Sequence, residues 1–195
     1  MRRLPTGPDR SRSTSHAVQP QFRAARVRAQ PSTNGSSAPE AMAVVSAGLL
    51  LYRRRGPSLE VFLVHPGGPY WAKKDDGAWS VPKGLVDGDE EELACARREF
   101  KEETGFDAPL AAPVHDLGTF RQPSGKQLHI WAVEGDCDPA ALSSNLFEME
   151  WPPKSGRRAR FPEVDRGGWF DRGQASLKIA SGQRPVLEKF YGDFG

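Results

Sequence analysis

The sequence GLVDGDEEELACARREFKEETGF, residues 84–106, constrains the fold more than any other part of the chain. Two glycines, Gly84 and Gly105, bracket four glutamates and an arginine. These charged residues are Glu90, Arg98, Glu99, Glu102 and Glu103, and apolar Phe100 and Phe106 lie between and after them. Asp89 and Glu92 have the spacing of a capping box, and Gly105 is a residue type that often ends helices. The pattern predicts a helix that begins after Asp89 and stops at Gly105.

This helix is expected to bring three carboxylates together. Residues three and four apart share a helix face, so Glu99, Glu102 and Glu103 converge. The apolar stripe beside them, which is expected to pack on a sheet, consists of Leu93, Ala96 and Phe100. Like charges at such spacing raise one another's pKa unless a cation neutralises them. Hard carboxylate oxygens favour Mg²⁺, with Mn²⁺ as a substitute.

Arg98 lies four residues before Glu102, which suits it to orienting a carboxylate or a ligand through a bidentate pair. The alternative is an ordinary solvated helix, whose charged residues face water. That alternative explains neither the paired glycines nor the lead-in WSVPKG at residues 79–84. The chain also lacks a His/Cys cluster of the kind that binds zinc.

Charge is distributed unevenly along the chain. Residues 1–38 hold seven arginines against Asp9, whereas from Met42 onward 20 basic and 23 acidic residues leave a formal charge of −3. This balance argues against general nucleic-acid binding as the main activity. Cys95 and Cys137 supply neither a disulfide framework nor a metal motif. Because no apolar run reaches the ~18 to 20 residues of a membrane span, we expect a soluble protein without a membrane partner.

Residues 1–41 are rich in Arg, Ser, Pro and Thr and have almost no apolar periodicity, so they are predicted to be disordered. Their composition is typical of an organelle transit peptide, which predicts an organelle matrix. Alternatively, Met42, which precedes the first strand-like run, is the true start of a cytoplasmic protein. In either case the folded domain is predicted to span residues 42–195.

Within that domain, strand-like runs alternate with turn signals. The predicted strands are residues 44–52, 59–65, 78–81, 114–121, 127–134 and 146–151. Residues 66–77 and the basic segment 153–162 are predicted to be loops, Trp169 and Phe170 a short buried segment, and residues 175–180 and 185–191 helical. Mixed strands with one central and one or two terminal helices predict an α+β fold, an α/β/α sandwich around a mixed sheet.

The segment 84–106 is similar to the Nudix box, which reads Gly, five residues, Glu, seven residues, then Arg-Glu-apolar-x-Glu-Glu-x-Gly-apolar. Every fixed position matches. The resemblance to the Nudix hydrolase superfamily, and hence the Nudix fold, extends from about Met42 to the C-terminus. The lead-in WSVPKG resembles the diadenosine tetraphosphate hydrolase-like branch, in which Pro-Lys-Gly replaces Pro-Gly-Gly. Inositol-pyrophosphate hydrolases carry a similar Pro-Lys-Gly.

The resemblance implies that water attacks phosphorus in a nucleoside diphosphate linked to another group. It implies metal ligands at Glu99, Glu102, Glu103 and the backbone carbonyl of Lys83, with Glu90 and Arg98 supporting the helix. The general base is expected to be Glu99 or Glu102. Glu163 is the candidate base or ligand from outside the box. The expected catalytic residues are therefore Glu99, Glu102 and Arg98.

Residues outside the box are candidates for binding the rest of the substrate. Phosphate-binding cations are expected among Lys83, Lys73, Lys74, Arg121 and Lys126, with a plain surface charge as the alternative for all but Lys83. Tyr70, Trp71 and Trp151 are candidates for stacking on a base, against packing as the alternative. The histidines His65, His115 and His129 are expected to be structural or surface residues.

The expected function is hydrolysis of a pyrophosphate linkage, with dinucleoside polyphosphates such as diadenosine tetraphosphate as the first substrate class. Nucleoside triphosphates, RNA 5′-pyrophosphates and inositol pyrophosphates are alternatives. A non-catalytic nucleotide sensor is an alternative of another class, but such a module is expected to have lost a box glutamate, and this chain retains all of them. The protein is expected to act on small molecules as a monomer or homodimer.

Overall fold

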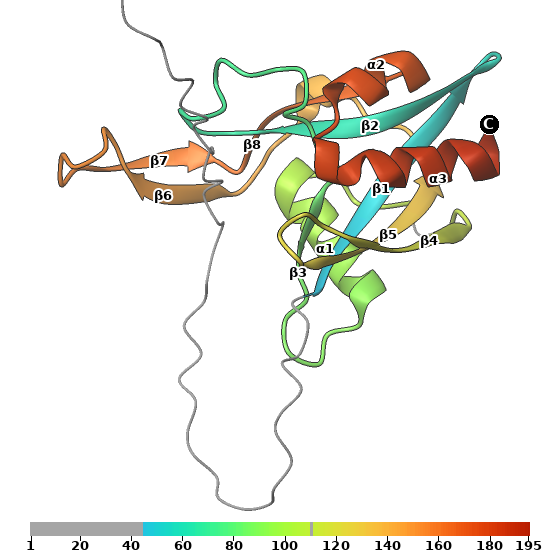
Figure 1. Cartoon of the computed structure of the whole chain (residues 1–195), viewed down its shortest axis with the longest axis horizontal. Helices are drawn as coiled ribbons and strands as arrows, with labels where there is room; N and C mark the ends of the chain where they lie inside the picture. Colours follow the sequence, from blue (N-terminus) through green and yellow to red (C-terminus); the bar gives the residue numbers. More distant parts are fainter. Residues whose placement is uncertain (1–44, 110) are drawn as a thin grey trace, which may run out of the picture. The chain divides into compact units, whose positions relative to one another are not determined.

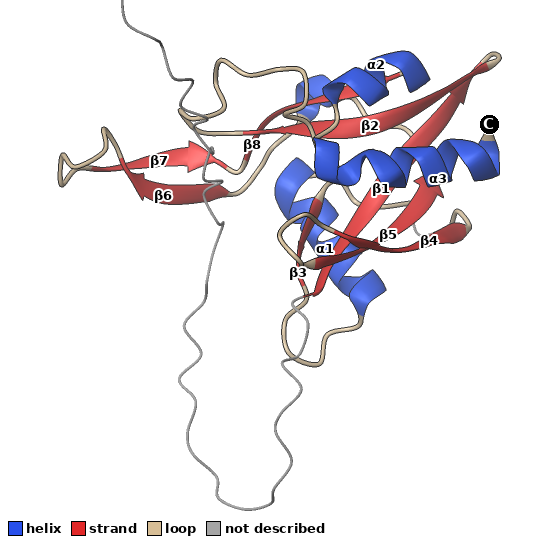
Figure 2. Ribbon diagram, in the orientation of Figure 1, coloured by secondary structure: helices blue, strands red, loops and turns tan. Residues whose placement is uncertain are grey.

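The computed structural model describes residues 45–109 and 111–195, whose helices and strands are shown in Figures 1 and 2. The predicted extension 1–41 and the boundary at Met42 lie outside the described residues. The strands are β1 Val45–Arg55, β2 Ser58–Pro66, β3 Lys83–Leu85, β4 Val114–Arg121, β5 Gln127–Glu134, β6 Leu146–Glu150, β7 Arg158–Pro162 and β8 Val164–Phe170. The helices are α1 Glu92–Thr104, α2 Arg172–Lys178 and α3 Arg184–Phe194, with short 3₁₀ turns η1 Pro139–Ala141 and η2 Ser181–Gln183.

β1 is the centre of a mixed sheet with the order β4-β5-β1-β2-β8. It pairs with β2 antiparallel and with β5 parallel, while its first residues also pair with the short strand β3. The sequence LLLY at residues 49–52 explains this position, because a strand covered on both faces needs consecutive apolar side chains. The predicted pair of strands at residues 44–52 and 59–65 is confirmed as this β1–β2 hairpin.

Alternate residues of β1 enter two separate cores, one on each face of the sheet. Leu49 and Leu51 pack with Ala96 and Phe100 of α1. Leu50 and Tyr52 pack on the opposite face, with the helices α2 and α3. The predicted sandwich is therefore confirmed, with α1 on one face and the two C-terminal helices on the other. None of the helices in the described part has the length and apolar character needed to cross a membrane.

β6 and β7 form a two-stranded sheet of their own, which projects from the rest of the fold in Figure 1. The prediction of a loop at residues 153–162 is wrong for its second half, since Arg158–Pro162 is a strand paired with Leu146–Glu150. The sequence RARF, residues 158–161, alternates charged and apolar residues, which fits a strand whose charged residues face outward. Its basic composition is equally typical of a loop, and this hides the alternation. Glu148 meets Arg160 across the pair at 3.2 Å.

The strand predicted at residues 78–81 is also wrong. Only single bridges form there, between Ser80 and Val64 and between Trp79 and Ile179. The backbone N–H of Val81 donates to the side chain of Gln183 at 2.9 Å rather than to a neighbouring strand. The strand begins after Pro82 instead, as β3.

The predicted start of the central helix needs correction, whereas its end is confirmed. The N-cap residue is Glu91 rather than Asp89, and its side chain makes no capping hydrogen bond. Asp89 lies in a turn in which the N–H of Glu90 donates to the carbonyl of Asp87 at 2.9 Å. Gly105 ends the helix at φ 79°, a left-handed conformation that glycine adopts without steric cost.

Candidate functional site

The candidate site is built where the short strand β3 meets the C-terminal half of α1. Leu49 N–H donates to Pro82 O and Val86 N–H to Val45 O, each at 3.1 Å. The first bond adjoins the pair of Gly48 with Lys83, and the second adjoins the pair of Ser46 with Leu85. Lys83 therefore belongs to a non-hydrogen-bonded pair, and its own N–H and C=O point away from β1. Its N–H donates to Glu103 Oε2 at 3.1 Å. The Lys83 carbonyl therefore faces the same side as this carboxylate.

Gly84 allows Glu99 to approach this strand. A Cβ added at Gly84 would overlap the Glu99 carboxylate, so any larger residue would force the side chain or the strand to move. One turn earlier on α1, Cys95 lies fully buried with its thiol 3.3 Å from Leu85 O. The first glycine of the box thus serves close packing between backbone and carboxylate rather than a turn.

Arg98 connects the box glutamates. Its Nε and one terminal nitrogen donate to both oxygens of Glu90, at 2.9 and 2.8 Å. The other terminal nitrogen donates to Glu99 at 2.7 Å and to Glu102 at 3.4 Å. The hydrogen bonds to Glu90 raise the pKa of Arg98, so the guanidinium stays charged. Arg98 therefore orients two of the three carboxylates predicted to converge.

Burial and like charge oppose ionisation in this cluster. Burial raises the pKa of Glu103 to about 7; the Lys83 ammonium and N–H oppose this shift, while Glu99 and Glu163 add to it. Burial also raises the pKa of Glu99, although Arg98 lowers it. The structure thus brings Lys83 and Glu163 to the carboxylates of the box, although Glu163 is 60 residues away from Glu103 in the sequence.

The side chains present fit a divalent cation in their chemistry. Among residues 45–109 and 111–195, no three His, Cys, Asp or Glu side chains are arranged as a ready metal site. Yet the cluster holds more carboxylates than cations, because Arg98 also pairs with Glu90, which leaves Lys83 as the cation beside the partly buried Glu103. Hard oxygen ligands with an excess of negative charge suit Mg²⁺.

Three distant segments meet beside the cluster. The backbone N–H of Asn145, just before β6, donates to Glu102 O at 3.0 Å. Glu163 N–H donates to Asn145 O at 2.8 Å, and Gly67 N–H donates to Glu163 O at 2.9 Å. The base of the β6–β7 hairpin, the end of β2 and the end of α1 therefore form one junction. Asn145 was not predicted as part of the site, since backbone bonds between distant segments leave no sequence motif.

The loop after β2 carries four of the predicted substrate-binding residues. Lys74 Nζ lies 4.3 Å from the centre of the Trp71 ring. The backbone carbonyl of Lys74 accepts a hydrogen bond from the ring of His65. His65 is fully buried and also contacts Asp165 Oδ1 at 2.7 Å. The expectation of a structural histidine fits these contacts. Lys73 is exposed in the same loop.

Of the three aromatic residues predicted as candidates for base stacking, Tyr70 and Trp151 lie together in the structure. Their ring centroids are 5.4 Å apart at an interplanar angle of 84°. Arg121 and Lys126 lie instead at the β4–β5 turn. β5 pairs with one edge of β1, and β3 pairs with the opposite edge at Ser46–Gly48. No contact joins these two cations to the box within the described residues.

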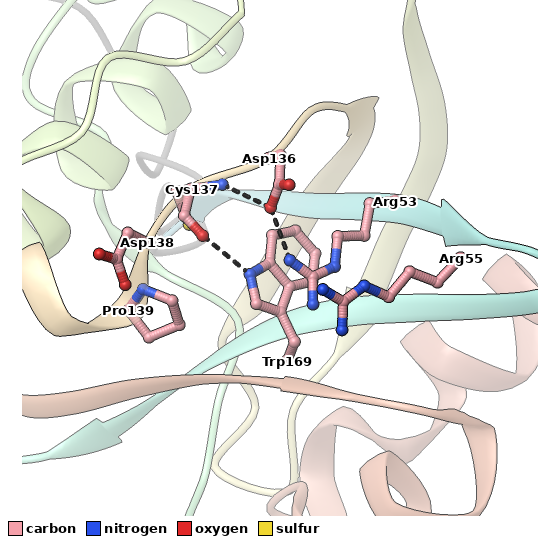
Figure 3. A pocket seen from close by; sticks show the side chains of 7 residues that line it. All are labelled: Arg53, Arg55, Asp136, Cys137, Asp138, Pro139 and Trp169. Atoms are coloured by element: carbon pink, nitrogen blue, oxygen red, sulfur yellow. Dashed lines mark hydrogen bonds and ion pairs between the residues drawn. The ribbon is translucent and has the colours of Figure 1, made fainter.

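A hollow of about 670 Å³ lies at the far end of β1, as Figure 3 shows. Its lining residues are Arg53, Arg55, Asp136, Cys137, Asp138, Pro139 and Trp169. Arg53 is five residues from Gly48 along the strand, or ~17 Å from the partner of Lys83. Glu60 and Asp136 each pair with Arg53, and Trp169 lies under its guanidinium at 4.2 Å. With its central cation neutralised, this hollow is not the expected polyphosphate site.

Comparison with known families and proteins gives matches over the same part of the chain. A family model described as the NUDIX domain matches residues 42–190. An uncharacterized 17.7 kDa protein of enterobacteria phage T4 is 32% identical over 97 residues, 49% of this chain and 63% of that protein. The m7GpppN-mRNA hydrolase of Saccharomyces cerevisiae is 30% identical over 98 residues, 50% of this chain and 8% of the yeast protein. The aligned parts cover less than two thirds of either relative.

Solved structures share the fold at low identity. A C. elegans Ap4A hydrolase in a binary complex matches with a TM-score of 0.54 and 22% identity, covering 76% of this chain and 96% of that chain. The NUDIX domain of Shewanella oneidensis NrtR complexed with ADP ribose matches with a TM-score of 0.57 and 16% identity, covering 82% and 94%. These matches agree with the sandwich of helices around a mixed sheet described above.

Proposed function

The chain belongs to the NUDIX domain family, and we propose that it is a divalent-metal-dependent hydrolase of pyrophosphate linkages in compounds of a nucleoside diphosphate with another group. The observation that carries this proposal is the junction of β3 and α1, where Arg98 orients Glu99 and Glu102 while the partly buried Glu103 accepts the N–H of Lys83. Such an arrangement is costly for a purely structural helix, because buried carboxylates without full compensation oppose folding.

We assign the cation, Mg²⁺ or Mn²⁺, to Glu99, Glu102, Glu103 and the carbonyl of Lys83, with Glu163 as a further ligand. When bound, such an ion polarises phosphate oxygens and lowers the pKa of a coordinated water. Glu99 or Glu102 accepts the proton of the attacking water. Burial raises the pKa of Glu99, which suits a base that works near neutral pH. Glu163 is the alternative base from outside the box.

The remaining roles follow from position. Arg98 keeps Glu99 and Glu102 in place, and its pairing with Glu90 fixes the guanidinium in turn. We assign the Lys83 ammonium, whose charge acts on Glu103, to a phosphate oxygen of the substrate. Cleavage of the P–O bond then separates the two phosphorylated products, and the attacking water supplies the new P–O bond of one of them.

We propose dinucleoside polyphosphates, such as diadenosine tetraphosphate, as the substrate class. The lead-in Pro82-Lys83-Gly84 favours them over mononucleotides. The protein is expected to act without a membrane or general nucleic-acid partner. We propose a cytoplasmic location for the protein, or an organelle matrix if residues 1–41 are a transit peptide.

The test is turnover by the purified protein with Mg²⁺ on diadenosine tetraphosphate, nucleoside triphosphates, 5′-triphosphorylated RNA and an inositol pyrophosphate, with products resolved by chromatography. We expect diadenosine tetraphosphate to be cleaved with the highest kcat/KM. Glu102→Gln is the matched control, because it keeps the size of the half-exposed side chain and removes its charge. Absence of turnover on every compound would contradict the proposal, and saturable binding without turnover would identify a sensor.

A further inference from the structure

The β6–β7 hairpin is joined to the candidate site by backbone hydrogen bonds at its base. Its two strands pair with each other and share no ladder with the six-stranded sheet. At the base, Asn145 N–H donates to Glu102 O, and Glu163 N–H donates to Asn145 O. The hairpin therefore starts at the carboxylate cluster and leads away from it, as Figure 1 shows for β6 and β7.

The loop after β2 follows the hairpin, because two glycines let the two backbones approach. A Cβ on Gly67 would overlap Pro162 O, and one on Gly68 would lie 3.1 Å from the Phe147 ring. Tyr70 is three residues beyond Gly67, which keeps its Cα within ~11 Å of the Cα of Gly67, the residue whose N–H donates to Glu163 O. Trp151 is six residues beyond Asn145, or at most ~20 Å along an extended strand. A base bound at these aromatic side chains would be linked to the box by an extended polyphosphate chain.

Tyr70 and Trp151 form an aromatic notch at this distance. Their rings meet edge to face with centroids 5.4 Å apart, an arrangement that leaves one ring face free for a further flat group. Tyr70 remains 46% exposed, although large hydrophobic side chains are usually covered. An exposed aromatic face held in place by a second ring is suited to stacking on a nucleobase.

Basic residues surround the notch at the hairpin tip. Trp151 N–H donates to the carbonyl of Arg157 at 2.9 Å, so Arg157 lies across the hairpin from the notch. Within the described residues, no carboxylate pairs with Arg157 or Lys154. Arg158 and Arg160 differ, because Glu148 pairs with both, at 3.8 and 3.2 Å. Glu150 also lies at the tip, where its Oε1 accepts the N–H of Gly156 at 2.8 Å. The two cations without an ion pair in the described part of the chain, Lys154 and Arg157, still exceed this one carboxylate in a domain whose formal charge is negative.

We infer that the hairpin is a nucleotide-recognition arm: the Tyr70–Trp151 notch stacks on a nucleobase of the substrate, and Lys154 and Arg157 attract its polyphosphate. The inference rests on the proposed function for the identity of the reacting group. It selects nucleotides over base-free substrates such as inositol pyrophosphates, because only a base can use the notch. Charge complementarity favours a nucleoside polyphosphate as the occupant, because its base can reach the notch and its phosphates the basic tip.

The test compares diadenosine tetraphosphate, as substrate, with inorganic tetraphosphate, as a base-free competitive inhibitor. Loss of stacking in Tyr70→Leu is expected to raise KM for the dinucleotide about tenfold, with kcat nearly unchanged. The inhibition constant of tetraphosphate should stay the same. Tyr70→Phe keeps the ring and should behave as the unmutated protein does.

A second pair of variants tests the charge. Arg157→Gln should raise both KM and the inhibition constant about threefold, with less effect at high salt, because exposed charges are screened. Arg158→Gln removes one charge from the same hairpin, but one already paired with Glu148, and should leave both constants near the original values. If the two variants change KM and the inhibition constant equally, Arg157 has no specific role in binding the polyphosphate.

The arm is overturned if Tyr70→Leu leaves KM for the dinucleotide unchanged. It is also overturned if the variant raises the inhibition constant of tetraphosphate by the same factor as KM. An RNA occupant would also overturn the arm. The sign would be that 5′-triphosphorylated RNA has a higher kcat/KM than diadenosine tetraphosphate and that Tyr70→Leu lowers kcat/KM for this RNA and for no other substrate. If the unmutated protein cleaves nothing, the proposed function fails. Equilibrium binding of diadenosine tetraphosphate in Ca²⁺ to the unmutated and Tyr70→Leu proteins then decides the arm independently.

Discussion

Gly84 is needed at its position because a side chain there would overlap the Glu99 carboxylate, and not because of glycine's backbone flexibility. Gly84→Ala is expected to displace Glu99 or β3 and to lower kcat/KM on the best substrate about 100-fold, as small misplacements of catalytic groups do. Gly192→Ala is the matched control, since α3 offers open space there and alanine favours helices. Steady-state kinetics and thermal unfolding of both variants provide the measurement. Full activity in Gly84→Ala would show that Glu99 tolerates displacement.

Arg98 is expected to depend on its planar shape as well as its charge. Lysine keeps the charge at this position but cannot bond both oxygens of Glu90 and also reach Glu99. Arg98→Lys should therefore lower kcat at least tenfold and lower the melting temperature. Arg97→Lys, on the neighbouring position without such contacts in the described part of the chain, should do neither. If Arg98→Lys keeps the kcat of the unmutated protein, the positive charge at this position is sufficient and the planar shape of the guanidinium is not needed.

The residues of the box could be predicted because they are local: Glu99, Glu102, Glu103 and Arg98 lie within five positions of one helix. The contacts around them were not predictable in the same way. His65 and Asp165 are 100 positions apart, and Tyr70 meets Trp151 only because Gly67 and Gly68 let a loop follow a hairpin. Such pairs depend on the register of strands that are distant in sequence.

At the level of the elements, His129 links the first turn of α1 to two strands. Its ring nitrogens lie 2.5 Å from Glu92 and 2.8 Å from Asp116. The hydrogen bond to His129 lowers the pKa of Asp116 below its ordinary value of 3.8. The charged carboxylate therefore stabilises the fold above pH 3.8, and this contribution is lost as pH falls through the lowered pKa.

Asp116→Asn removes this contribution while its amide oxygen can still accept the N–H of Gly118. We expect a lower melting temperature than that of the unmutated protein at pH 7, with the difference closing below pH 3.8. The two side chains are partly exposed, so the difference should be small and should shrink in salt. Melting curves followed by circular dichroism across this pH range provide the check. A difference that grows on acidification would exclude this pair as its cause.

Elements with an apolar periodicity were predicted well, including β4 and β5 with their full bounds. The errors occur where side chains override local preference. Asp89 is a good capping residue, but Glu90 is held by Arg98, and the helix begins after it. Arg158–Pro162 looked like a loop because its charges hid an alternation that only its partner β6 makes meaningful.

For the molecule as a whole, a bound cation should offset the repulsion and burial of the box carboxylates. Mg²⁺ that binds only the folded state stabilises it by mass action, by about 2.7 kcal/mol at 100 times the dissociation constant. The melting temperature is therefore expected to rise by several degrees on titration with Mg²⁺. Glu103→Gln should melt higher than the original protein without metal and respond much less to it. An equal response in both proteins would place the cation elsewhere.

The separation of the two sheets gives this chain an engineering property. The β6–β7 hairpin can be exchanged as a cassette from Leu146 to Pro162, since no ladder bond to the main sheet would be broken. The backbone bonds at Asn145 and Glu163 need to be kept, and so do Phe147 and Pro162, which pack against the glycines of the loop after β2. Grafted hairpins with other tips would then retarget the protein to new ligands while the hydrolytic centre on α1 and β3 stays as it is.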